Sequence, residues 1–235
     1  MSRIKLGIKV LGLCALVFAF MGIASSGAQA AGTWLVLEGG TVTEGTGGEL
    51  ILETDKNAIL HSKISGVSVL FECPEIETVG ATLGAAGTVT KGSKIRYKKC
   101  TTSLNGSVSA PCEPNNGGTE KGVIVTKPGH AAFVLNEAKE ELTEVTPDEG
   151  ETFATIEMGK ECSIGTKVPV IGKLFLKDCE KAFLTHLPKH LVEEGPGTAL
   201  WTISKTEEHK ASLLGSAWAK VRTSGVFREY GAHAG

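Results

Sequence analysis

Short apolar runs separated by turn residues are the feature that most limits how this chain can fold. Residues 49–54, 64–73 and 121–127 are rich in β-branched and leucine side chains, and clusters of Gly, Asn, Asp or Pro interrupt such runs about every 8–12 residues. Glycine is abundant, at 30 of 235 residues, which suits frequent turns. The pattern predicts an all-β fold, an antiparallel β-sandwich or β-barrel of about twelve short strands.

Residues 131–142 are ambiguous between helix and strand. Their Ala, Leu and Glu content suits a helix, but residues 132–135 and 142–145 can equally form two strands that turn at residues 137–140. The segments on both sides have strand patterns, and Pro147 follows closely. We therefore expect two strands.

The N-terminus has the composition of a secretory signal. Arg3, Lys5 and Lys9 precede an apolar run over residues 10–23, and Ala28 and Ala30 give the small-x-small end that signal peptidase accepts. The apolar run is shorter than the ~20 residues that a spanning helix needs. We expect residues 1–30 to be removed and residues 31–235 to form one β-rich domain without a transmembrane segment. That product is expected to be secreted, or held in the cell envelope.

The cysteines predict a disulfide framework. Of six cysteines, Cys14 lies in the leader, and outside the cytoplasm the other five tend to be oxidised. A three-residue hairpin loop at residues 105–107 would place Cys100 opposite Cys112, whereas a two-residue loop at Asn105 and Gly106 would not. We predict the bridges Cys100–Cys112 and Cys162–Cys179, with Cys73 as a free thiol. A Cys73–Cys100 bridge across a longer hairpin is the competing arrangement.

Charge offers no indication of a nucleic-acid partner. The formal net charge is −2, and loss of the three basic leader residues makes it −5. The remaining basic residues are dispersed rather than clustered, so nucleic-acid binding is not expected. The acidic residues between 137 and 151, Asp148 included, are expected to form a solvated face.

Catalytic and metal-binding motifs are weak. His186 and His190, with Glu194 behind them, have the four-residue spacing of a helical zinc site, but Pro188 between them would break the helix. Ser216 lies in Gly-Ser-Ala-Trp-Ala, which lacks the last glycine of the hydrolase motif Gly-x-Ser-x-Gly. We expect no metal and no cofactor. The prediction leans towards a non-enzymatic protein that acts by binding or in the cell envelope; a secreted hydrolase with a site around His186 and His190 is the alternative.

Tryptophans suggest a second alternative, a carrier of a small apolar ligand. Trp201 and Trp218 lie in apolar segments and are expected to fill the core. The interior of a barrel lined by such residues can hold a small apolar molecule.

Six segments of the sequence carry a resemblance to other proteins: residues 122–127, 143–160, 168–180, 189–197, 215–219 and 231–235. These phrases resemble a family of uncharacterised secreted proteins of soil actinobacteria. The phrases span most of residues 31–235. The resemblance implies export and a shared fold, and carries no activity, ligand or functional residues.

Overall fold

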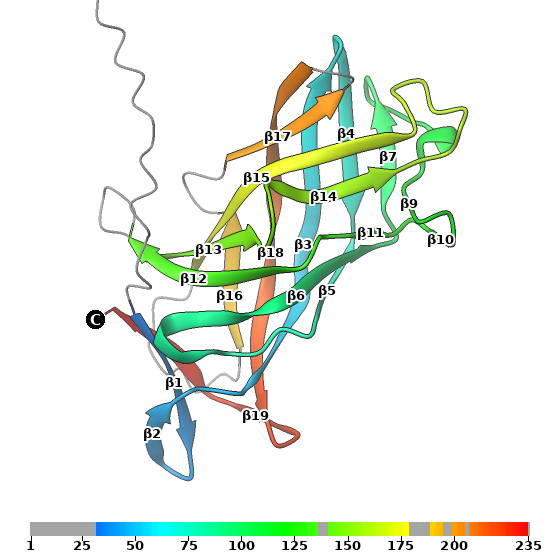
Figure 1. Cartoon of the computed structure of the whole chain (residues 1–235). Coiled ribbons are helices and arrows are strands. Elements are labelled where there is room, and N and C mark those ends of the chain that lie inside the picture. The colour runs from blue at the N-terminus through cyan, green and yellow to red at the C-terminus, as the bar shows by residue number, and fades with distance from the viewer. Residues whose placement is uncertain (1–31, 136–140, 179–188, 195–198, 205–206, 235) are drawn as a thin grey trace, which may run out of the picture.

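The fold is built almost entirely from antiparallel β-strands (Figure 1). The computed structural model describes residues 32–135, 141–178, 189–194, 199–204 and 207–234, so the expected leader and its cleavage site lie outside the described residues. Neither of the two short 3-10 turns, η1 (Ala85–Gly87) and η2 (Ala110–Cys112), is long enough to cross a membrane. The predicted all-β, antiparallel, disulfide-bridged fold is confirmed.

Two long strands are the main elements of one side of the folded sheet, here called the first wall. β3 (Glu49–Ile64) and β18 (Glu207–Thr223) pair antiparallel from Arg222 opposite Glu49 to Ala211 opposite Ser62. Both strands run along most of the length of the described fold (Figure 1). Neighbouring strands extend this wall on both sides: β4 (Val67–Cys73), β7 (Thr101–Leu104), β8 (Ser107–Val108) and β19 (Val226–Arg228).

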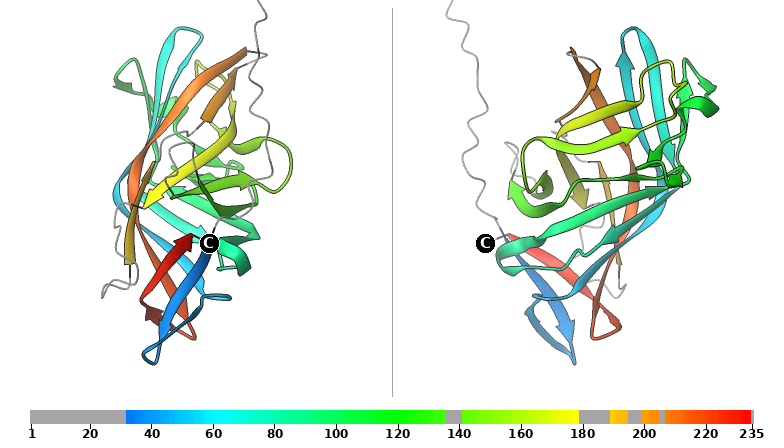
Figure 2. Two further views of the ribbon diagram at one scale, coloured as in Figure 1. Left: turned by 90° about the vertical axis from the view of Figure 1, so that its left-hand side faces the viewer. Right: turned by 45° about the vertical axis from the view of Figure 1, so that its right-hand side comes forward.

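A second wall faces the first one across the interior (Figure 2). Its strands pair in the order β5, β6, β12, β13, β15, and β14 continues along β15. β16 and β17 connect β15 to β18, so the sheet bends over on itself. The strands are β5 (Glu75–Val79), β6 (Thr88–Lys98), β12 (Gly129–Leu135), β13 (Glu141–Pro147), β14 (Thr152–Glu157), β15 (Lys167–Asp178), β16 (Lys189–Glu194) and β17 (Ala199–Ser204).

The bent sheet does not close into a regular barrel. Between β5 and β3 the described residues form no continuous ladder; the two meet through side-chain hydrogen bonds, and a single bridge joins Glu49 to Thr82 just beyond β5. Three short strands, β9 (Asn115–Asn116), β10 (Glu120–Lys121) and β11 (Ile124–Val125), lie at the edge near β6 and β14. One side of the interior is therefore bounded by looser contacts than the rest.

A small separate sheet covers one end of the interior. β1 (Gly32–Glu38) pairs with β2 (Thr41–Glu44) on one side and with β20 (Tyr230–Ala234) on the other. The first and last described strands are thus neighbours. Trp34 on β1 and Tyr230 on β20 are buried against the large sheet, where they belong to a core cluster with Val89 and Val221.

In β6, apolar and charged residues alternate along the sequence, and this alternation gives the strand one buried and one exposed face. Ile95 and Tyr97 pack inward, while Arg96 and Lys98 point outward and pair with Glu77 on β5 at 3.6 and 2.9 Å. Successive side chains of a strand point to opposite faces, so this mixed sequence supplies core and surface together. The ambiguous segment after residue 131 likewise contains two strands, β12 and β13, as predicted.

The disulfide prediction is wrong in its pairing. The bridges are Cys73–Cys100 and Cys112–Cys162, so Cys73 is not the free thiol, and Cys179 lies outside the described residues. The hairpin after β7 is the two-residue form, with positive φ at Asn105 and Gly106 and Leu104 paired with Ser107. The competing Cys73–Cys100 bridge forms because β4 and β7 pair up to Glu72 and Thr101, which leaves the two cysteines adjacent.

The tryptophan prediction is also wrong in detail. Trp201 and Trp218 are only half-buried, whereas Trp34 is 7% exposed and belongs to the core. The alternation within each strand shows that one of its faces is apolar. The small sheet that carries Trp34, however, joins the two ends of the described chain. Local sequence alone does not reveal that contact.

Candidate functional site

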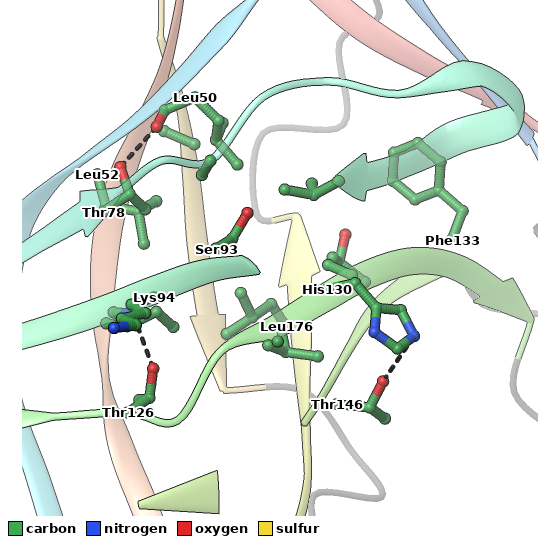
Figure 3. A pocket seen from close by; sticks show the side chains of 18 of the residues that line it. Leu50, Leu52, Thr78, Ser93, Lys94, Thr126, His130, Phe133, Thr146 and Leu176 are labelled. Atoms are coloured by element: carbon green, nitrogen blue, oxygen red, sulfur yellow. Dashed lines mark hydrogen bonds between the residues drawn. The ribbon is translucent and has the colours of Figure 1, made fainter. Parts of the chain in front are cut away.

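The described residues enclose an apolar cavity between the two walls, here called the main cavity. Its volume of about 110 Å³ exceeds the ~10–15 Å³ that one water molecule needs on the same measure. Strands from both walls and from the small end sheet contribute to it (Figure 3). Its apolar lining includes Trp34, Leu50, Leu52, Val89, Phe133 and Val145.

The end sheet closes part of this cavity through Trp34. The indole Nε1–H donates a hydrogen bond to the backbone oxygen of Thr88 at 2.8 Å, and the indole ring lies 4.1 Å from the ring of Phe133, centroid to centroid. Tyr230 stands on the other side, and its hydroxyl donates to the backbone oxygen of Ala219. Trp34 therefore presents an apolar surface to the cavity while its polar atom is already bonded.

Three hydroxyl groups on the wall are likewise bonded within the protein. Thr78 Oγ1 donates to the backbone oxygen of Leu50 at 2.5 Å, and Ser93 Oγ donates to that of Thr90 at 2.6 Å. Thr126 Oγ1 accepts the backbone N–H of Ile95 at 2.9 Å. Because these hydroxyl groups already bond to the backbone, that of Thr78 to β3 and that of Ser93 within β6, they add little free polar surface to the wall (Figure 3). An apolar molecule would meet few unpaired polar atoms along this part of the wall.

His130, Thr146 and Asp148 form a polar cluster beside the main cavity. Their contact was not predicted from the sequence. Nδ1 of His130 lies 2.8 Å from Oδ1 of Asp148, and Nε2 of the same ring lies 3.1 Å from Oγ1 of Thr146. The other oxygen of Asp148 accepts the backbone N–H of Gly92 at 2.7 Å. His130 and Thr146 are directly opposite each other in the pairing of β12 and β13. The cluster therefore fastens the bend of β6 at Gly92 to these two strands.

Asp148 departs from the solvated acidic face that the sequence predicted. Its side chain is only 15% exposed. Burial raises the pKa of this carboxyl, but the Gly92 N–H and the His130 ring lower it by more, so the net pKa lies below the ordinary value. The signal in the sequence was the position of Asp148 just after Pro147, where a strand ends and a turn begins.

A pH-dependent stability is expected from this cluster. Asp148→Asn should lower the free energy of unfolding by about 1 kcal/mol at neutral pH, because it removes a charge-assisted hydrogen bond. The folded-state pKa is depressed, so the contribution of the carboxylate is present above its unfolded pKa of ~3.9 and is lost as the pH falls through the lower folded value. Urea unfolding of both proteins between pH 7 and pH 3 measures this.

The exposed neighbour Glu149 provides the control. Glu149→Gln changes the same charge without a buried partner, and its unfolding free energy should follow that of the wild type. A difference between wild type and Asp148→Asn that stays constant down to pH 3 would contradict the role given to Asp148.

The metal-site candidates from the sequence are not assembled in the described structure. His190 and Glu194 lie on strand β16, not on a helix, and His186 is outside the described residues. Within the described ranges, no three His, Cys, Asp or Glu side chains form a group that could hold a metal ion. Ser216 donates its hydroxyl to Asp55 at 2.7 Å and has no histidine bonded to it in this part of the chain.

Comparison with known proteins adds no relative. No protein-family model matches the chain, and no curated protein sequence or solved structure is significantly similar to it. The resemblance to secreted actinobacterial proteins therefore stays a prediction. The main cavity is the site on which a function can be built.

Proposed function

We propose that this chain is an exported, non-enzymatic binding protein that holds a small apolar molecule in the main cavity. The observation that carries the proposal is an interior space whose lining is mostly hydrocarbon and whose hydroxyl groups Thr78, Ser93 and Thr126 are already bonded to the protein. Small-molecule sites are typically concave, apolar and preformed. Burial of hydrocarbon surface from water would supply the affinity.

Export is supported by two independent features. The first 30 residues have the charge and hydropathy of a cleavable leader, and two disulfides cross-link the described chain. Disulfides of this kind persist in oxidising compartments outside the cytoplasm. Cleavage after Ala30 would leave one residue before β1, which pairs with both β2 and β20.

Uptake of an apolar fluorescent probe tests the proposal. N-phenyl-1-naphthylamine should bind the wild type saturably with one molecule per chain, seen as a rise in its fluorescence. Ala131 is buried and lines the main cavity, so Ala131→Leu fills part of the space and should weaken binding by at least about tenfold, the equivalent of ~1.4 kcal/mol. Circular dichroism confirms that the variant is folded.

Val108→Leu is the matched control, since Val108 is 73% exposed and is not part of the cavity lining. This variant should bind the probe as the wild type does. Failure of the wild type to take up the probe, or equal affinity for wild type and Ala131→Leu, would refute the proposal.

A further inference from the structure

The main cavity shares part of its lining with a second hollow, here called the middle cavity. Its volume is about 50 Å³. Leu52, Ile95 and Leu176 line both spaces. Leucine and isoleucine side chains change rotamer at little cost compared with the backbone, so these three residues form a movable partition. The two cavities therefore lie side by side, with apolar side chains between them.

Tyr97 lines the middle cavity but not the main cavity. It also lines a third hollow of about 40 Å³, which lies next to the Cys73 bridge. Tyr97 is 7% exposed, and among the described residues its hydroxyl has no hydrogen-bond partner. Burial raises the pKa of this phenol, so it remains a neutral donor. The hydroxyl oxygen is not one of the fully enclosed unpaired atoms of the described residues, so an acceptor can approach it.

We propose that the ligand is one linear molecule, with an oxygen-bearing end that accepts a hydrogen bond from Tyr97 and a hydrocarbon tail that runs through the middle cavity into the main cavity. This inference rests on the proposed function and names the class of its ligand. A compact ring system would occupy the main cavity alone and leave the Tyr97 hydroxyl unpaired. A linear chain uses both cavities and satisfies that hydroxyl.

Chain length is the first test, with octan-1-ol and dodecan-1-ol as probes in calorimetric titrations. Each CH₂ that moves from water into the cavities should tighten binding about fourfold, so dodecan-1-ol should bind at least about tenfold more tightly than octan-1-ol. Ala217 is buried and lines the middle cavity but not the main one. Ala217→Ile should weaken both alcohols at least about tenfold and leave N-phenyl-1-naphthylamine uptake unchanged.

Ala132→Ile is the matched control, because Ala132 on β12 is half-buried and lines none of the three cavities. It should bind both alcohols as the wild type does. If dodecan-1-ol binds no more tightly than octan-1-ol, or if Ala217→Ile leaves both affinities unchanged, the linear ligand is refuted while uptake of the naphthylamine still supports the main cavity. If the naphthylamine does not bind either, the proposed function fails as well.

Removal of the hydroxyl is the second test. Tyr97→Phe keeps the ring and should weaken octan-1-ol by about three- to tenfold, the effect of one lost hydrogen bond. Octane has the same chain without the oxygen, and its affinity should be the same in wild type and variant. Thermal unfolding without ligand checks the fold and should show no large loss, since the substitution keeps the ring and removes only a hydroxyl that makes no hydrogen bond within the described residues. An equal loss for octane and octan-1-ol, or no loss for either, would overturn the role of Tyr97.

Discussion

Replacing Cys112 and Cys162 together by alanine is expected to lower the free energy of unfolding by about 4 kcal/mol. The bridge spans 50 residues of sequence, and the chain-entropy relation gives a cost of this size for a loop of that length. Cys112 is fully buried, so alanine avoids placing a hydroxyl in the core. The loss is a large part of the ~5–15 kcal/mol that stabilises a typical domain. Urea unfolding of the oxidised proteins measures it.

The Cys73–Cys100 bridge provides an internal comparison. It spans 27 residues, so the corresponding double alanine variant should lose somewhat less, about 3.5 kcal/mol. Peptide mapping without reductant should recover the two linked pairs, Cys73 with Cys100 and Cys112 with Cys162. Recovery of a Cys100–Cys112 peptide, or unchanged stability of the Cys112/Cys162 variant, would contradict the pairing.

Trp34→Ala is expected to cost about 3–5 kcal/mol of unfolding free energy, the range for removing a large buried aromatic side chain. The substitution removes the contacts with the rings of Phe133 and Tyr230. It also removes the indole hydrogen bond to the backbone oxygen of Thr88, which then accepts only the backbone N–H of Gly84. Because Trp34 joins the small end sheet to the second wall, limited proteolysis should also cut the variant near β1 sooner than the wild type. Urea unfolding gives the free energy.

Val42→Ala on the adjacent strand β2 is the control for this effect. Val42 is 46% exposed, so its truncation should change the unfolding free energy by no more than about 0.5 kcal/mol. A loss below about 1 kcal/mol for Trp34→Ala would mean that the end sheet contributes little to the fold and does not close the main cavity.

The candidate site could be predicted only in outline. An apolar interior able to hold a ligand was one of the alternatives that the strand patterns suggested, but Trp201 and Trp218 were expected to line it, and Trp34 does so instead. Tyr97 belongs to an alternating strand, and nothing near it in the sequence indicates that its hydroxyl lacks a partner. Asp148 and His130 are separated by 18 residues, and their contact depends on the register between β12 and β13.

By itself, the sequence determined the β-structure of this protein. Two of its signals are local: the period-two alternation of segments such as β6, and the turn at Asn105 and Gly106. They depend on residues close together in the chain, so they favour strands and turns before any distant strands have paired. Tertiary structure alone decided which cysteines meet, that the first and last described strands share a sheet, and where the cavities lie. These features depend on how far a curved sheet bends before its walls face each other. The packing of many distant side chains together sets that bend, and no local pattern encodes it.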